Sequence, residues 1–435
     1  MSYDLYVVSP SSDVVTTLRL LVVKGDSTNA AKEFVKLVHG RSSQYEQFID
    51  GEMQTMRSLG LLPSQPDRAI FPPGSWFLQF TFTLAKPWMS KDDDPFYVAE
   101  SVNPVRKDKV FKVPMMSAAS WKGLLRWTLM HTRLALKKES LTPEHFAQER
   151  FVQALLFGDE KGEEPGQVKG FAAYLDALKP EARQEYERLL RTYYELKPDD
   201  PLPHHSGRLL FYPTFFNLID VEVINPHSRR TKAGTHPIYL ECVPAGAQGT
   251  FSLLYVPFDL IGQPEAEIKK QAVEDLQRVA EGLQAMFLTY GFSAKRSSGY
   301  GVAEERVKNG FFQIRFEERP APTPAPPPDV KVPLPKYLQA PGRLKDEYLN
   351  PDGTFRERSQ DELAKMSKPQ KQEYEKAKKW WESKGKALAE QPAVEPEPPP
   401  PTPSPQWLKR EFGSFDELMQ KAEEAANLLR AGGEE

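Results

Sequence analysis

The chain has 435 residues, a net charge of −3 at pH 7, 40 prolines and one cysteine. A single cysteine excludes an internal disulfide, and no apolar run reaches the roughly 18 residues that a membrane helix needs. The nearly balanced charge excludes a chain that is basic throughout, so any nucleic-acid surface must be a local patch. Because the N-terminus also lacks a signal-peptide pattern, we expect a cytoplasmic protein.

Prolines divide the chain, because they are concentrated in its last third. Proline-rich stretches are extended and act as semi-rigid spacers between folded parts. The tail from Ser414 carries a capping box with Glu417 and an apolar helical face. The predicted parts are an N-terminal extension packed on the core (1–70), a folded domain (71–317) with a helical insertion (138–206), a proline-rich linker (318–340), a charged and partly helical segment (341–391), a second proline-rich linker (392–405) and an amphipathic docking helix (406–435).

Within the folded domain, apolar spacing predicts strands and helices in a defined order. Trp76–Leu84 alternates apolar and polar residues, as a half-buried strand does, whereas Ser117–Lys137 has apolar residues at helical spacing. Asp220–Cys242 is predicted to be a loop. The later elements are strands at Gly207–Phe216 and Phe251–Phe258, a helix at Pro264–Tyr290 and a final strand at 312–316. This order predicts an α+β fold with a ferredoxin-like βαββαβ core, which RNA-recognition domains also use.

A glycine-rich segment, Gly291–Gly301, follows the second predicted helix. Its three glycines allow positive φ angles and a close approach of the backbone to a ligand. Exposed amides can then line an anion site, to which Lys295 and Arg296 add charge and Ser297 and Ser298 add hydroxyl donors. Glycine-rich connections between a helix and a strand are also common without any ligand, so this segment alone does not decide the function.

The first predicted helix carries a stripe of basic residues, which could bind the same anion as the glycine-rich segment. Lys122, Arg126, Arg133 and Lys137 lie within about 60° of one another on the helix wheel. Such a stripe can simply be a solvated face. Lys122 and Arg126, however, lie near the helix N-terminus, where positive charge does not help the helix and where the dipole favours anions. This position favours a role in binding a phosphate.

The motifs resemble those of the RAMP superfamily of CRISPR-associated proteins. The matching pieces are Asn103–Arg106 (Asn-Pro-Val-Arg), Val113–Arg126, Leu156–Gly158 (Leu-Phe-Gly) and Gly291–Gly301. Asp220–Pro226 with His227 looks most like the backbone subunits of type III effector complexes, especially the subunit near the 3′ end of the guide. The resemblance implies a CRISPR RNA-binding backbone subunit that grips guide phosphates without reading sequence, kinks the guide with a projecting hairpin and helps to position target RNA.

The resemblance also implies partners and contact residues. The partners are the guide RNA, the target RNA, other RAMP backbone subunits, small helical subunits and the large signalling subunit, with no membrane. RNA binding of this kind requires no cofactor. Tyr300 could stack a base or a sugar. The residues expected to contact RNA are Ser117, Ser120, Lys122, Arg126, Arg229, Arg230, Lys295, Arg296, Ser297, Ser298, Gly299 and Tyr300.

Two enzymatic alternatives remain open beside this structural role. Some relatives cut target RNA with a divalent metal and an aspartate placed just before the Asn-Pro-Val-Arg segment, but here that neighbourhood reads Ser101-Val102-Asn103. Asp92, Asp93 and Asp94 lie in the same predicted loop and could hold Mg²⁺ as a substitute; a solvated acidic loop is the other interpretation. The second alternative is a metal-independent guide-processing ribonuclease. It would use a histidine as acid or base, and the available residues are His204, His205, His227 and His236.

Overall fold

The computed structural model describes residues 14, 17, 35–39, 43–64, 70–91, 102–160, 169–202, 204–227, 230, 234, 238–316, 335–340, 343–385 and 406–431. The chain forms two compact units. The larger unit contains Met1–Glu317 and Pro405–Glu435, and the smaller unit is Glu318–Ser404. In the described part of the chain, no helix has the length and apolar character needed to cross a lipid bilayer.

The centre of the larger unit is a five-stranded sheet in the order β12-β9-β1-β8-β4, with every neighbouring pair antiparallel. Leaving out β12, the order β9-β1-β8-β4 is that of a ferredoxin-like sheet, in which the first and third strands are central and the last strand lies beside the first at one edge. The predicted α+β fold class is confirmed. The strands are β1 (Trp76–Leu84), β4 (Leu209–Phe211), β8 (Gln248–Tyr255), β9 (Ala303–Phe316) and β12 (Gln406–Ser414).

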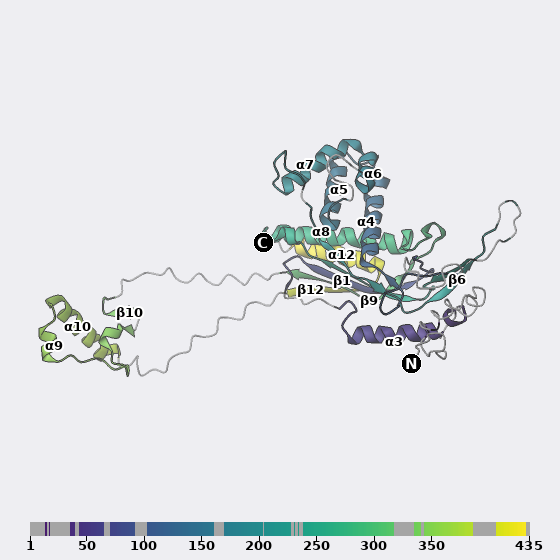
Figure 1. Cartoon of the computed structure of the whole chain (residues 1–435). Coiled ribbons are helices and arrows are strands. Elements are labelled where there is room, and N and C mark those ends of the chain that lie inside the picture. Colours follow the sequence, from purple (N-terminus) through teal and green to yellow (C-terminus); the bar gives the residue numbers. More distant parts are fainter. Residues whose placement is uncertain are drawn as a thin grey trace, which may run out of the picture. The chain divides into compact units, whose positions relative to one another are not determined.

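Helices lie on both faces of this sheet (Figure 1). One face carries α4 (Ala118–Arg133), α8 (Glu265–Gln284) and α12 (Phe415–Ala431), and the opposite face carries α3 (Gln44–Ser58). Between the sheet and the first three helices is an aromatic core whose rings contact one another edge to face or by stacking. Its main members are Phe80, Phe82, Trp121, Phe251 and Phe287, all fully buried.

The C-terminal segment differs from the sequence prediction, which made 406–435 a docking helix. Its first nine residues form β12, whose Gln406 pairs with Phe316 of β9. The helix α12 then packs on α8, and Phe415, Leu418 and Ala422 are fully buried. The strand was missed because Arg410 interrupts the apolar alternation and because its partner, β9, ends 90 residues earlier in the chain (406 − 316).

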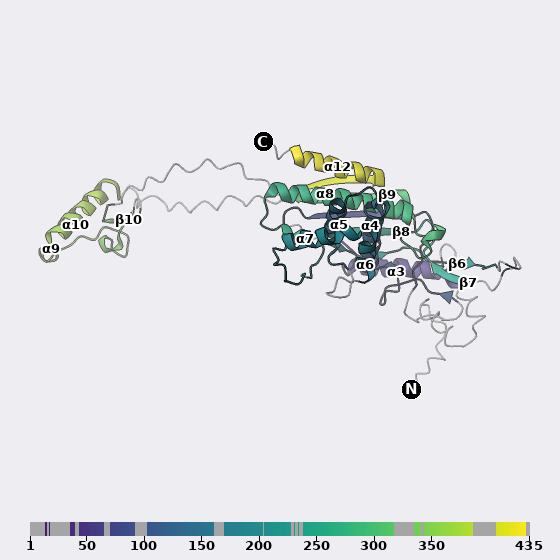
Figure 2. The same cartoon turned by 90° about the horizontal axis from the view of Figure 1, so that it is seen from above.

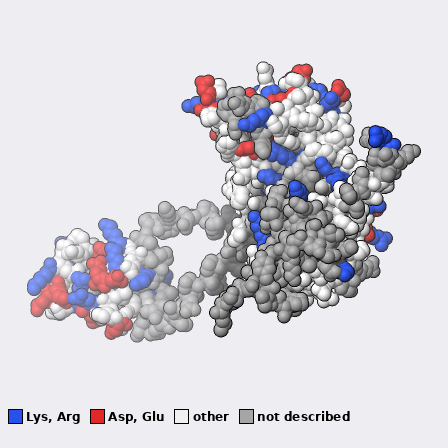
Figure 3. Space-filling view, turned by 45° about the vertical axis from the view of Figure 1, so that its right-hand side comes forward, with Lys and Arg blue, Asp and Glu red and all other residues white. Residues whose placement is uncertain are grey.

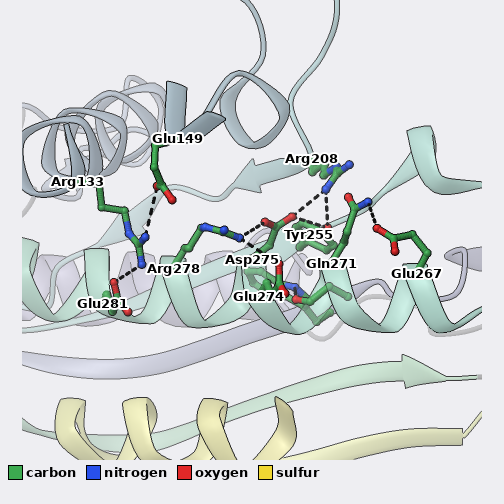
Figure 4. A network of polar contacts seen from close by, with 12 residues as sticks. Arg133, Glu149, Arg208, Tyr255, Glu267, Gln271, Glu274, Asp275, Arg278 and Glu281 are labelled. Atoms are coloured by element: carbon green, nitrogen blue, oxygen red, sulfur yellow. Dashed lines mark hydrogen bonds and ion pairs between the residues drawn. The ribbon is translucent and has the colours of Figure 1, made fainter. Parts of the chain in front are cut away.

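A helical lobe stands on this layer, formed by α5 (Pro143–Phe157), α6 (Gly170–Leu178) and α7 (Arg183–Tyr193). It has its own apolar core, to which Met130 and Leu134 from the C-terminal end of α4 and its following turn contribute. Ion pairs join the lobe to α8 through Arg133, which bridges Glu149 of the lobe and Glu281 of α8 (Figure 4).

The stretch Asp220–Cys242, predicted to be a loop, contains a β-hairpin instead. Strand β6 (Asp220–Ile224) pairs antiparallel with β7 (Ile238–Cys242), and the short β2 (Val102–Asn103) pairs parallel with β7. The hairpin runs outward from one end of the sheet in both views (Figures 1 and 2). Two further short strands, β3 (Met115–Met116) and β5 (Thr214–Phe215), pair beside α4.

The smaller unit contains β10 (Leu338–Ala340), β11 (Arg343–Leu344), α9 (Gln360–Ala364) and α10 (Lys368–Trp380). Its core includes Tyr348, Phe355 and Tyr374. Strand β10 lies within 318–340, the stretch predicted to be only a linker. The whole unit is inserted between β9 and β12, which are neighbours in the sheet of the larger unit.

Candidate nucleic-acid interface

The first side of the candidate site is the N-terminus of α4. Ser117 caps this helix by accepting a hydrogen bond from the Ser120 amide at 3.2 Å, and the two hydroxyls lie 2.9 Å apart. Trp121 anchors the first turn in the core, where its indole donates to the Thr214 hydroxyl at 3.0 Å. The first turn contains no acidic residue. Its positive dipole end is therefore left available to an anion.

The second side is the glycine-rich loop, whose base is clamped to the segment that follows β1. The Ser293 hydroxyl accepts from the Met89 amide at 2.7 Å and lies 3.0 Å from the Met89 carbonyl, to which the Ala294 amide also donates at 2.8 Å. Gly301 donates to Pro87 at 2.8 Å, and the Trp88 indole donates to Phe292 at 3.0 Å. These bonds make the base of the loop rigid.

The tip of the loop is exposed, in contrast to its base. Lys295 and Gly299 both have left-handed backbones, with φ of 59° and 79°, and they enclose one 3₁₀ turn, Arg296–Ser298. Lys295, Ser297 and Ser298 are exposed and Arg296 is partly exposed. The loop therefore presents charge and hydroxyl groups on a fixed base, as a phosphate cradle requires.

The two sides meet around a cavity of about 330 Å³. The α4 wall is formed by Ala119, Ser120 and Gly123, and the loop wall by Phe292, Ser293 and Ala294. The segment after β1 closes one end with Trp88, Met89 and Ser90. Two segments that lie about 170 residues apart in sequence are thus brought to one site.

Arg106 also lines this cavity, and sequence reasoning omitted it from the contact residues although it ends the Asn-Pro-Val-Arg motif. Its backbone is fixed between Ser90 and Met115. The next residue, Lys107, forms a buried ion pair with Glu241 of β7, which also accepts from the Val105 amide at 3.0 Å. Among the described residues the Arg106 guanidinium has no hydrogen-bond or ion-pair partner.

The basic residues of the α4 stripe differ in whether their charge already has a partner within the protein. Arg126 donates to the carbonyls of Asp159 and Gly158 at the end of α5, at 2.9 and 3.3 Å, and lies over the Phe171 ring. Arg133 is held in ion pairs by the lobe and α8. Lys122 is partly buried; burial first, and then the charge of Arg126, lower its pKa. Lys137, the fourth residue of the predicted stripe, lies beyond the end of α4 in the 3₁₀ turn Ala135–Lys137. Of the three cations on α4, Lys122 is therefore the one best placed to gain from a bound anion.

The surroundings of the site are locally basic. Residues 102–133 contain seven basic residues and one acidic residue: Arg106, Lys107, Lys109, Lys112, Lys122, Arg126 and Arg133 against Asp108. Figure 3 shows Lys and Arg side chains on the larger unit below the helical lobe, while the acidic side chains of the larger unit in that view lie mainly on the lobe. Basic side chains are thus locally concentrated in this part of a chain whose net charge is −3.

Comparison with known proteins now places this domain. The RAMP superfamily model matches residues 95–304, which run from the segment after β1 to the start of β9. Residues 95–304 belong to the RAMP superfamily. A comparison with curated proteins gave no significant match.

Solved structures that match include a chain of a cryo-EM structure of the type III-B Cmr-beta complex bound to cognate target RNA, with 12% identity, a TM-score of 0.29 and coverage of 65% of this chain and 71% of that chain. Two CRISPR RNA-guided surveillance complexes, one in a pre-nicking state, match with 13% and 15% identity and TM-scores of 0.30. They cover 57% of this chain and 80% and 72% of theirs. At this level of similarity the identification rests on the family model.

In the RAMP domain, two further residues that were predicted to contact RNA, Tyr300 and Arg230, do not line the cavity. The Tyr300 hydroxyl donates to Glu222 of β6 at 3.2 Å, which ties the glycine loop to the hairpin, and burial followed by the Glu222 charge raises its pKa. Arg230 is exposed in the hairpin connection, and Arg229 lies outside the described residues.

The enzymatic alternatives have no assembled site in the described part of the RAMP domain. Asp92, Asp93 and Asp94 lie outside the described residues, although Ser90 and Arg106, on either side of them in sequence, both line the cavity. His204 and His205 contact Asp159 at the edge of the lobe instead. The described residues include no group of three or more His, Cys, Asp or Glu that could hold a metal.

Two glycines of the loop provide a matched test of its rigidity. A Cβ at Gly301 would lie 2.7 Å from the Ser293 amide nitrogen, whereas a Cβ at Gly299 would meet nothing within 4 Å. Both have positive φ, 70° and 79°, so alanine adds similar backbone strain of about 1 kcal/mol at each. We expect Gly301→Ala to lower the melting temperature and RNA affinity more than Gly299→Ala. Equal effects in thermal unfolding and in RNA titration would contradict a tightly closed loop.

Proposed function

We propose that this protein is a CRISPR RNA-binding subunit that holds the sugar-phosphate backbone of a guide RNA between α4 and the glycine-rich loop. The observation that carries the proposal is the cavity at which the α4 N-terminus, Arg106 and the base of the glycine loop converge. A helix N-terminus, an arginine and a glycine-rich loop each suit phosphate, and none of them reads base identity.

We place this subunit in the backbone of a type III effector complex. The Asp220–Pro226 motif resembles the subunit near the guide 3′ end, and its hairpin is tied to the glycine loop through Tyr300 and Glu222. A hairpin fixed to the RNA-gripping loop would hold a bound strand at a defined point, as positioning of a target RNA requires. The neighbouring subunits would be other RAMP proteins, small helical subunits and the large signalling subunit.

The test is to co-express the full chain with a CRISPR array, purify it, and extract and sequence the bound RNA. The proposal predicts guide RNA in the wild-type protein and at least about a 100-fold loss of affinity in the triple variant Arg106→Glu, Lys122→Glu and Arg296→Glu, because three cations near phosphate change sign. The salt dependence of binding should also become weaker. A triple variant of exposed lysines in the smaller unit, Lys368→Glu, Lys379→Glu and Lys384→Glu, has the same charge change and should retain RNA. RNA-free wild-type protein would overturn the proposal.

The lowered pKa of Lys122 predicts a pH dependence of RNA binding. Burial lowers its pKa below the ordinary value of 10.5 in the free protein, and a bound phosphate would raise it again because phosphate favours the charged amine. Binding therefore takes up a proton, and affinity should fall as pH rises through the lowered pKa towards 10.5. Lys122→Arg, which stays charged, should flatten this dependence. A wild-type affinity that does not change over this window would place Lys122 away from the RNA.

A second candidate is metal-dependent cleavage of a guide-bound target RNA by Asp92, Asp93 and Asp94, with Mg²⁺. The observation that favours it is that residues on both sides of this segment, Ser90 and Arg106, line the proposed RNA cavity. Replacing all three aspartates with alanine in the assembled complex tests it. Loss of one cut site in a mapped target would support cleavage by this chain, and an unchanged cleavage pattern would refute it.

A further inference from the structure

Arg296, at the tip of the glycine loop, is held by an aromatic side chain of α4. Its guanidinium carbon lies 4.5 Å from the centroid of the Trp127 ring, within the range of a cation–π contact. Trp127 follows Arg126 directly and projects from the same helix that forms the opposite wall of the cavity. This contact therefore joins the two sides of the proposed RNA site.

Trp127 is itself fixed by two further rings. His131, one turn later on α4, stacks on it with a centroid distance of 5.0 Å and an interplanar angle of 7°. Tyr290 meets Trp127 and His131 edge to face, at 5.4 and 5.3 Å. The indole that supports Arg296 is thus held by two other aromatic side chains.

Tyr290 reaches this cluster through an irregular helix end. The last turn before the glycine loop, Ala285–Tyr290, is a π-helix, and it stops at Gly291 with φ of 72°. Single π turns widen a helix locally and occur often at functional sites. A Cβ at Gly291 would lie 2.9 Å from the Tyr300 carbonyl, so the loop closes tightly just after Tyr290. The rings and the loop base are therefore positioned by one connected piece of backbone.

The guanidinium of Arg296 keeps its hydrogen-bonding capacity in this arrangement. In the described part of the chain its N–H groups have no hydrogen-bond or ion-pair partner, unlike those of Arg126 and Arg133. An arginine that lies against a ring can still donate through the edge of its plane, and this fork matches the two oxygens of a phosphodiester. Ordering such a long side chain before the ligand arrives removes part of the entropy cost of binding.

We infer that Trp127 is a positioning residue: it pre-orders Arg296 so that the guanidinium meets one phosphodiester of a single-stranded RNA at the mouth of the cavity. The inference rests on the proposed RNA-binding function and specifies how one cation of that site works. It has two requirements. The side chain at position 127 must be an aromatic ring, and the cation at position 296 must be a planar guanidinium.

The test uses the purified full chain, a fluorescently labelled single-stranded RNA as the probe, and six proteins: wild type, Trp127→Leu, Trp127→Phe, Arg296→Ala, Arg296→Lys and the double variant Trp127→Leu with Arg296→Ala. Affinities are measured below the melting temperature of every variant. Trp127→Leu should bind about tenfold more weakly, the size of a partly desolvated cation–π contact, and Trp127→Phe should recover most of the loss. Arg296→Lys should bind more weakly than wild type but less weakly than Arg296→Ala, because lysine keeps the charge but lacks the planar fork.

The double variant decides between positioning and simple packing. If Trp127 acts through Arg296, the double variant should bind no more weakly than Arg296→Ala alone. Additive losses, or a Trp127→Leu protein that binds like wild type, would overturn the inference while leaving the proposed function intact. If Trp127→Leu does not fold, the comparison of Arg296→Lys with Arg296→Ala still tests it, because wild-type affinity in the lysine variant would contradict the planar requirement. A wild-type protein that binds no RNA would overturn the proposed function and this inference together.

Discussion

Deletion of residues 406–435 is expected to unfold the larger unit, although these residues form the end of the chain beyond a long insertion. Strand β12 pairs with β9 along most of its length, and Phe412, Phe415 and Leu418 are buried in the main core. Loss of one buried phenylalanine side chain costs about 3–5 kcal/mol. Removing the two phenylalanines and Leu418 alone therefore costs about 8–15 kcal/mol, which is comparable with the 5–15 kcal/mol by which a typical domain is stable. The expected result is insoluble protein or loss of the cooperative thermal transition.

The matched control for this deletion is a variant that lacks far more residues but keeps β12 and α12. Excision of 317–405, with Phe316 joined to Gln406 through an Asn-Gly turn, deletes the smaller unit and keeps every core contact of β12 and α12. Phe316 and Gln406 are paired neighbours, and a two-residue turn of this type connects antiparallel strands. We expect this shortened chain to melt within a few degrees of the full chain. If the deleted C-terminus has no effect, or if excision unfolds the larger unit, β12 does not complete the sheet in this way.

Arg208→Met is expected to cause a large loss of stability for the substitution of a single charged residue. Arg208 and Asp275 have side-chain exposures of 3% and 4% and are paired at 2.9 Å, and Asp275 also accepts from Tyr255 at 2.8 Å (Figure 4). Arg208 further contacts Asp259, 3.0 Å from its Nε. Removing the arginine takes the nearer cation from the buried Asp275 carboxylate and leaves it only the longer ion pair with Arg278, at 3.5 Å, at a cost of about 3–5 kcal/mol.

Measuring the melting temperature of the Arg208→Met variant tests this prediction. For a unit of this size each kcal/mol corresponds to about 2–4 °C, so Arg208→Met should melt roughly 6–20 °C lower than wild type. Combining it with Asp275→Asn should recover part of the loss, since the buried charge is then removed while Tyr255 keeps an acceptor. Arg188→Met, which breaks an exposed ion pair with Glu185 on α7, should leave the melting temperature unchanged. Equal shifts for Arg188→Met and Arg208→Met would contradict a structural role for the buried network.

The sequence alone was most informative where local patterns agree with the tertiary contacts. Alternation in Trp76–Leu84 predicted β1 with the bounds that the structure has, and Ser117 marked the start of α4. Both elements bury one face against the same core, so their residue spacing records the contact. The family motifs similarly pointed to the α4 N-terminus and the glycine loop, because glycine, small residues and cations are needed there for local reasons.

The rest was decided by contacts between distant segments. Strand β12 exists because β9 offers it an edge with which to pair. Lys122, Arg126 and Arg133 have the same sequence signature, but within the described ranges Arg126 is hydrogen-bonded to carbonyls and Arg133 is ion-paired with carboxylates, whereas Lys122 forms neither kind of bond. The backbone next to Arg106 is fixed by the buried Lys107–Glu241 ion pair, and the Arg296 side chain is held against the Trp127 ring. Sequence spacing thus determined which residues can form helices, strands and charged loops. Only the tertiary structure decided which charges remain free for a ligand, because a cation's partner is set by what packs beside it and not by its neighbours in the chain.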